Sequence, residues 1–129
     1  MPKVTQLVLN LPSRPGVLAK VARVLGEAGI TLEGVCAAES TGGGRIRLLV
    51  SNIAQAQTAL QAAKFRYAQE DAIAVPLEDW PGTLAEAAQK LAQAQVNITC
   101  VYATAGGDRP PAIVLTVSDL SKSLTALEG

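Results

Sequence analysis

The sequence predicts an α+β fold made of two tandem βαββαβ modules, the second of which lacks its last strand. Two observations lead to this prediction: the chain repeats itself, and each copy alternates short apolar strands with amphipathic helices. The chain has 129 residues, and with 49% hydrophobic and 17% charged residues it can bury a core. We expect the modules at residues 1–69 and 70–129.

The repeat becomes visible when the sequence is shifted against itself by 66 residues. Pro15-Gly16 then falls on Pro81-Gly82. The shift becomes 67 only after the Gly- and Pro-rich segments 39–44 and 105–111. Turns tolerate insertions, so a shift that changes only at a turn indicates a duplicated fold.

The first module is predicted from the spacing of its apolar residues. Leu7, Leu9 and Leu11 share one face of a strand, and the next apolar stripe has helical spacing until Gly29 ends the helix. The expected elements are strands at 4–11, 31–38, 45–51 and 65–69 and helices at 17–28 and 53–63.

The second module repeats this order. The expected elements are strands at 72–78, 97–104 and 112–118, helices at 83–94 and 119–127, and a loop at 105–111. The sequence ends before a fourth strand of this module.

This order of elements folds most simply as an antiparallel sheet with two helices on one face, the ferredoxin-like arrangement. The other face also needs cover, because Val4, Val8, Ala72 and Ala74 are apolar. The missing strand leaves two possibilities open: the segment 64–78 serves both modules as one long strand, or a second chain completes the sheet. We favour a homodimer.

Charge and hydropathy exclude several classes of partner. Eleven basic and eleven acidic residues give a net charge of zero without a Lys/Arg cluster, which argues against binding nucleic acid or a membrane surface. No apolar run approaches the roughly 20 residues of a membrane span, and the N-terminus does not resemble a signal peptide. We expect a cytoplasmic protein.

The residue types needed for catalysis are scarce. The sequence has no histidine, which removes the commonest general base and the commonest metal ligand. Cys36 and Cys100 lie in apolar stretches and form no Cys-x-x-Cys pair, so we expect small buried side chains rather than a disulfide or metal site. We therefore expect no cofactor, no metal and no enzymatic activity.

The turn between the first strand and the first helix of each module carries Pro-Gly, at Pro15-Gly16 and Pro81-Gly82. Ser13 and Asp79 are suited to cap the helix, and free N–H groups at a helix N-terminus attract carboxylates. A structural interpretation stands beside this one, because Pro-Gly is common at turns and Ser13 and Asp79 could serve only as caps.

The second of these turns resembles a known signature. Asp79-Trp80-Pro81-Gly82-Thr83-Leu84, with Asn97-Ile98 opening the next strand, resembles the ACT-domain pattern Asp-x-Pro-Gly-x-Leu followed by Asn-Ile. Ser13-Arg14-Pro15-Gly16-Val17-Leu18 with Thr31 resembles it too, with Ser13 in place of the acid and Thr31 in place of Asn. The first site is therefore expected to be altered or inactive, unless Arg14 clamps an anion.

The resemblance implies a regulatory module of amino-acid metabolism that binds a small molecule, most often an amino acid, at an interface between modules. Such modules usually pair side by side. Carried over to this sequence, the implied ligand-binding residues are Asp79, Trp80, Pro81, Gly82, Thr83, Leu84, Asn97 and Ile98, with Ser13, Arg14, Gly16, Val17, Leu18 and Thr31 opposite. Trp80 is equally suited to a pocket wall and to a dimer contact.

Two functions follow as hypotheses. In the first, the protein senses an amino acid and modulates a partner metabolic enzyme or its own assembly. In the alternative, it is a ligand-free dimerisation module that acts as a regulatory subunit.

Overall fold

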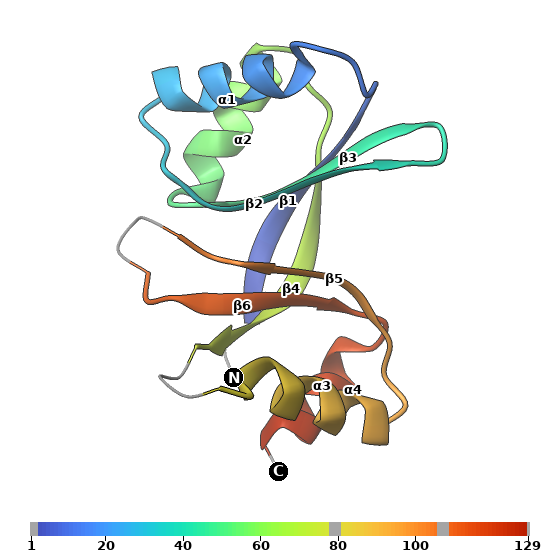
Figure 1. Ribbon diagram of the computed structural model, residues 1–129. Coiled ribbons are helices and arrows are strands. Elements are labelled where there is room, and N and C mark those ends of the chain that lie inside the picture. Colours follow the sequence, from blue (N-terminus) through green and yellow to red (C-terminus); the bar gives the residue numbers. More distant parts are fainter. Residues whose placement is uncertain (1–2, 78–80, 106–108, 129) are drawn as a thin grey trace. The chain divides into compact units, whose positions relative to one another are not determined.

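The computed structural model describes residues 3–77, 81–105 and 109–128. Their secondary structure runs β1 (Lys3–Leu11), α1 (Val17–Glu27), β2 (Leu32–Ser40), β3 (Gly43–Val50), α2 (Ile53–Ala62), β4 (Ala68–Pro76), α3 (Thr83–Gln93), β5 (Ile98–Ala103), β6 (Ala112–Val117) and α4 (Leu120–Glu128) (Figure 1). The strand order in the sheet is β2-β3-β1-β4-β6-β5. The predicted α+β fold with repeated βαββα order is confirmed.

One element differs from the prediction. The segments 65–69 and 72–78 were expected to be two strands, but a single strand, β4, covers Ala68–Pro76. The polar pair Glu70-Asp71 interrupts the apolar pattern without breaking the strand, because both side chains have hydrogen-bond partners on β1. A polar residue in a strand is tolerated when it is hydrogen-bonded.

The chain divides into two compact units, and the first contains Gln6–Glu70. Its strands follow the order β2-β3-β1-β4, and α1 lies beside α2 on one face (Figure 1). Its core contains Leu7, Leu9, Val21, Leu25, Ile30, Ile46, Leu48, Val50, Ala56 and Leu60. This is a complete ferredoxin-like module.

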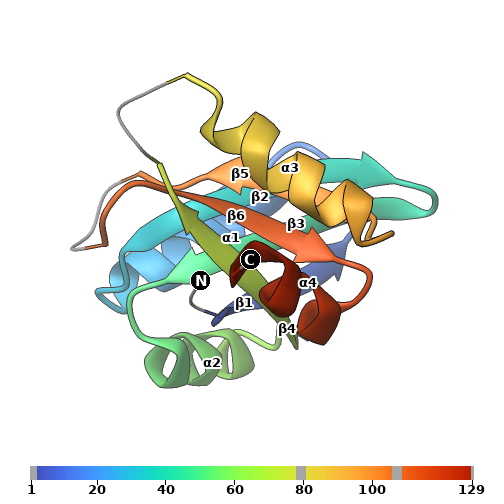
Figure 2. The same ribbon diagram turned by 90° about the horizontal axis from the view of Figure 1, so that it is seen from below.

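The second unit is built from the described residues of Met1–Thr5, Asp71–Ala105 and Pro110–Gly129. Figure 2 shows α3 and α4 covering one face of its strands. Its core contains Ile73, Val75, Ala87, Leu91, Val96, Ile113, Leu115 and Leu127.

The start of β1 completes the sheet of this second unit. The Thr5 hydroxyl donates to the Asp71 carboxylate at 3.5 Å, and the Lys3 ammonium lies 3.9 Å from the same carboxylate. The strand that the second module lacks is thus supplied by the N-terminal strand of the same chain, so a second chain is not needed to complete the sheet.

The apolar residues predicted on the second face of the sheet are buried. Val4 and Val8 are each 8% exposed, Ala74 is 5% exposed, and Ala72 is fully buried.

No helix in the described ranges is long and apolar enough to cross a membrane.

Leu25 and Leu91 occupy corresponding positions in α1 and α3, and neither is accessible to solvent. Leu25→Ala and Leu91→Ala are each expected to lower the free energy of unfolding by about 2–5 kcal/mol, because each leaves a cavity in a core. Leu84→Ala, at a leucine that is 45% exposed, is the control and should stay within about 1 kcal/mol. Urea unfolding followed by circular dichroism measures all three; a Leu25→Ala loss as small as the control would contradict this packing.

Candidate functional site

Both Pro-Gly turns place a glycine directly before a helix. Gly16 (φ 90°) is the N-cap of α1 and Gly82 (φ 104°) is the N-cap of α3. In this left-handed region a side chain costs about 1–2 kcal/mol. A Cβ at Gly16 would meet no atom within 4 Å, so the glycine is required by the backbone conformation and not by a close approach.

The prediction that Ser13 caps α1 is wrong. The helix begins after Gly16, and no side chain forms a capping hydrogen bond there. Asp79, the corresponding residue of the second turn, lies outside the described residues, as does Trp80. The first turn of α1 also contains no acidic residue, so its N–H groups face no carboxylate from their own helix.

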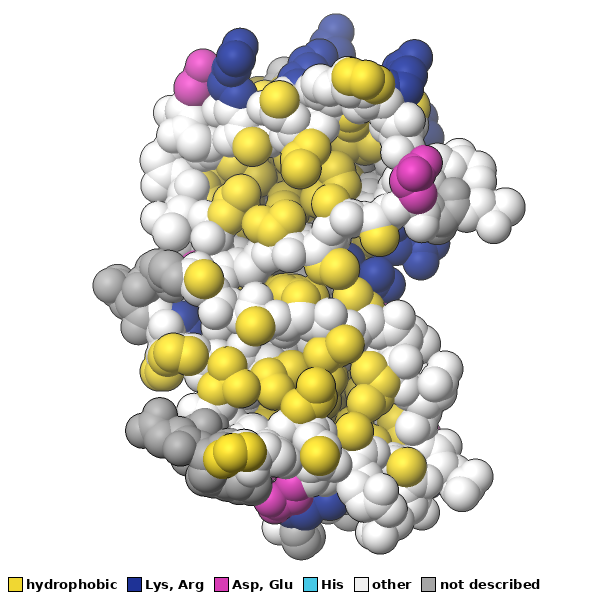
Figure 3. Space-filling model, viewed as in Figure 1, with side chains coloured by type: hydrophobic (Ala, Val, Ile, Leu, Met, Phe, Trp, Pro, Cys, Tyr) yellow, Lys and Arg dark blue, Asp and Glu magenta, His cyan; other side chains and the backbone are white. Residues whose placement is uncertain are grey.

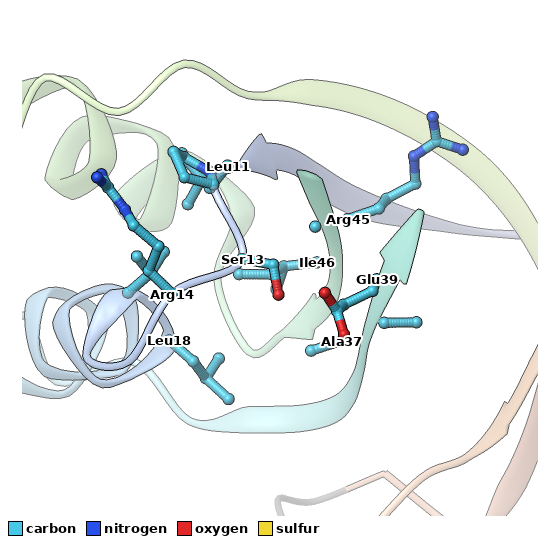
Figure 4. A pocket seen from close by; sticks show the side chains of 12 residues that line it. Leu11, Ser13, Arg14, Leu18, Ala37, Glu39, Arg45 and Ile46 are labelled. Atoms are coloured by element: carbon cyan, nitrogen blue, oxygen red, sulfur yellow. The ribbon is translucent and has the colours of Figure 1, made fainter. Parts of the chain in front are cut away.

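A cavity of about 160 Å³ opens beside the first turn (Figure 4). It is lined by Leu11, Pro12, Ser13, Arg14, Val17, Leu18, Ala37, Ala38, Glu39, Gly44, Arg45 and Ile46. The residues come from the turn after β1, the start of α1, the end of β2 and the start of β3. Sites for drug-sized ligands measure about 300–1,000 Å³, so this cavity suits a smaller molecule.

The polar groups of the cavity are arranged unevenly. In Figure 4 the Ser13 hydroxyl and the Glu39 carboxylate point into the same space, whereas the side chains of Arg14 and Arg45 point away from it. Arg45 is held in this position because its Nε donates to the Asn10 side-chain oxygen at 3.0 Å. The charge that faces the cavity is therefore the Glu39 carboxylate.

Gly44 provides the space in front of this carboxylate. It is paired with Glu39 in the β2–β3 ladder and with Leu11 in the β1–β3 ladder. A Cβ at Gly44 would lie 3.4 Å from the Leu11 carbonyl oxygen and 3.6 Å from the Ser13 Cβ. The missing side chain thus forms part of the floor of the cavity.

The structure brings together four of the predicted site residues, Ser13, Arg14, Val17 and Leu18. Thr31 is not among the residues that line the cavity, because it precedes the start of β2 and the cavity uses the end of that strand.

Thr31 and Asn97 share a structural role. The Thr31 N–H donates to the Ser51 hydroxyl at 3.1 Å, and the Asn97 N–H donates to the Ser118 hydroxyl at 3.0 Å. The serine N–H groups return the bond to the carbonyls of Thr31 and Asn97, at 3.0 and 2.9 Å. Each residue thereby ties the start of an edge strand to its neighbouring strand.

The described part of the second turn is mostly open to solvent. Pro81, Gly82 and Leu84 are exposed, while Thr83 is only 8% exposed. Ile98 is half-buried and packs against the core of its unit. Leu84 is therefore accessible to a ligand, whereas Thr83 is buried.

Sequence reasoning missed Glu39, Gly44 and Ile46. Their signal lies in the hairpin: a glycine run marks the tip, and antiparallel pairing from the tip outward places Glu39 opposite Gly44. Cys36 and Cys100 are half-buried and form no disulfide. No group of three or more His, Cys, Asp or Glu side chains in the described ranges could hold a metal ion.

The chain matches a known family of domains. The family model for an ACT domain pair matches residues 2–123. A search of curated protein sequences finds no significant match.

Several solved structures have the same fold. Protein BT0572 from Bacteroides thetaiotaomicron is 27% identical, with a TM-score of 0.83, over 98% of this chain and 87% of that one. The ligand-free regulatory subunit of aspartate kinase from Thermus thermophilus is 19% identical, with a TM-score of 0.61, over 98% and 90%. The corresponding subunit from Thermus flavus is 19% identical, with a TM-score of 0.56, over 98% and 90%. At 19% identity the likeness shows the shared fold.

The turn glycine and a helix glycine should respond oppositely to alanine. Gly16→Ala is expected to lower the free energy of unfolding by about 1–2 kcal/mol, because φ is 90° there. Gly26→Ala, inside α1 with open space around it, should raise the free energy of unfolding by up to about 1 kcal/mol. Denaturant titration of both variants gives the comparison, and equal effects would refute the assigned turn geometry.

Proposed function

The chain belongs to the family of ACT domain pairs, and from this membership we propose that it is a regulatory protein that binds a small amino acid. The observation that carries the proposal is the cavity at the first Pro-Gly turn, where predicted site residues come together. We propose modules at residues 1–69 and 70–129, with this first site as the one that binds.

The chemistry of the cavity suits such a ligand. Leu11, Leu18 and Ile46 offer apolar contacts to an aliphatic side chain. The first turn of α1 offers N–H groups, and the positive end of the helix dipole, to a carboxylate. Ser13 adds a hydroxyl that both donates and accepts.

We also propose that two copies of the chain associate. The same two positions are exposed and apolar in both modules: Leu18 and Leu84 at the helix starts, 46% and 45% exposed, and Val35 and Val101 on β2 and β5, 40% and 45% exposed. Figure 3 shows hydrophobic side chains gathered between α1 and β2 and, separately, between α3 and the strands β5 and β6. Because β2 and β5 are the end strands of the sheet, pairing along an edge would cover these residues.

Ligand binding and association would be coupled. Leu18 lines the cavity and is also exposed, so a second copy that covered it would change the wall of the site. A ligand with different affinity for the free and the associated state shifts the equilibrium between them. A partner enzyme of amino-acid metabolism, suggested by the family, would read out that shift.

A ligand-free interaction module is the second candidate. The exposed leucine and valine in each module favour it, because association alone would explain them. A non-catalytic role is common to both candidates. The sequence has no histidine that could activate the Ser13 hydroxyl.

Thermal unfolding with each of the common amino acids at millimolar concentration tests the first candidate. An amino acid at about 100 times its Kd adds about 2.7 kcal/mol to the stability, which raises the Tm of a domain of this size by several degrees. Gly44→Ala, which places a methyl group in the cavity, should reduce the rise, and Gly26→Ala should not. A flat panel on the unmodified protein would rule against amino-acid binding and leave the interaction module.

Association is tested at the edge strands. Val35→Lys and Val101→Lys are each expected to raise the dimer Kd tenfold or more, because a charge on an edge strand opposes pairing. Gln89→Lys, on the exposed side of α3, serves as the control. Sedimentation velocity over a range of concentrations measures the change, and a monomeric unmodified protein at every concentration would refute the dimer.

A further inference from the structure

We propose that Glu39 binds the ammonium group of the ligand and thereby makes the first-module cavity selective for free amino acids over molecules that lack an amino group. The inference rests on the proposed function, since it concerns the same cavity. It names the residue that sets the chemical class of the ligand.

The direction of the charged side chains is the first argument. Three charged residues line the cavity, yet only the Glu39 carboxylate points into it, together with the Ser13 hydroxyl, and Arg14 and Arg45 point away (Figure 4). An anionic wall attracts a cation, and an ammonium group can donate to a carboxylate and a hydroxyl together.

The ladder register explains why Arg45 does not neutralise Glu39. In the β2–β3 ladder Arg45 is paired with Ala38, and Glu39 is paired with Gly44, so Arg45 and Glu39 project from opposite faces. The Arg45 Nε is engaged by the Asn10 side chain at 3.0 Å. Within the described ranges, no ion pair to Glu39 forms, and the carboxylate is available to a ligand.

The second module does not repeat this arrangement. With the shifts of 66 and 67 residues, Ala105 stands where the first module has Glu39, and Pro111 stands where it has Gly44. The second module keeps the backbone pairing that joins Leu11 to Gly44 in the first, because the Leu77 N–H donates to the Pro111 carbonyl at 3.2 Å. The Glu39 carboxylate and the open space at Gly44 are thus found in the first module alone. In that same module Ser13 replaces the turn acid, Asp79, of the second.

The volume of the cavity limits the size of the ligand. A cavity of about 160 Å³ has room for a small amino acid, and its lining includes apolar side chains such as Leu18 and Ile46. The class that fits is a small amino acid with an aliphatic side chain and an unblocked α-amino group.

Isothermal titration calorimetry tests the proposal in two independent arms. In the first arm, each common L-amino acid and its N-acetyl derivative are titrated into the unmodified protein. Acetylation removes the cation, so the N-acetyl form of any amino acid that binds should bind at least tenfold more weakly.

In the second arm, the same amino acids are titrated into Glu39→Gln. This variant keeps the shape of the side chain and removes its charge, and its Kd should rise tenfold or more. Glu27→Gln, at an exposed glutamate at the end of α1 outside the cavity, is the matched control and should bind like the unmodified protein. The Tm without ligand should be equal for all three.

The outcomes separate the two proposals. Binding to the unmodified protein that survives in Glu39→Gln, or that tolerates N-acetylation, would overturn the role of Glu39 and leave amino-acid sensing intact. No binding of any amino acid to the unmodified protein would overturn both. The first arm needs no variant, so it can overturn the proposal even if Glu39→Gln does not fold.

Discussion

The fold depends on two nine-residue strands, β1 and β4, that each contribute to both compact units. Lys3–Thr5 of β1 belongs to one unit and Gln6–Leu11 to the other, while β4 divides after Glu70. A ferredoxin-like module needs four strands to cover its helices, and the second repeat brings three. Because β1 and β4 each serve twice, both modules have four strands although the sheet has six in all.

Because β1 and β4 belong to both units, some of their polar side chains are buried and need hydrogen-bond partners. Gln6 has no accessible surface, and its amide donates to the Glu70 carboxylate at 2.9 Å. The Arg47 Nε donates to the same carboxylate at 2.9 Å, and its side chain is only 12% exposed. Breaking such a network leaves a buried group unpaired, so these residues hold β1, β3 and β4 in register. No buried side-chain polar atom in the described ranges lacks a partner.

The sequence predicted what depends on periodicity. The repeat and the alternation of apolar residues identified the strands and helices, and the Pro-Gly pairs marked both helix starts. The sequence left the continuous strand β4 as one of two possibilities, because Glu70-Asp71 looks like an interruption until the side chains of β1 that bind it are known. The capping role assigned to Ser13 was wrong for a local reason: the N-cap is Gly16, a glycine with positive φ three residues later.

Only the part of the cavity that is local in the sequence was predicted. Ser13, Arg14, Val17 and Leu18 are close together in the sequence, and the Pro-Gly turn pointed to them. Glu39 and Gly44 reach the cavity only through the pairing of β2, β3 and β1, which no local pattern reveals.

Duplication has preserved the geometry of the modules and changed their chemistry. The turn glycines, the exposed leucines of α1 and α3 and the serine bonds at Thr31 and Asn97 are the same in both modules. The glycines and the serine bonds determine the backbone conformation, and the leucines form an exposed apolar surface. Positions 13, 39 and 44 differ from their counterparts, and all three line the cavity of the first module. The two modules thus share a backbone frame, while residues at the cavity of the first module differ from their counterparts in the second.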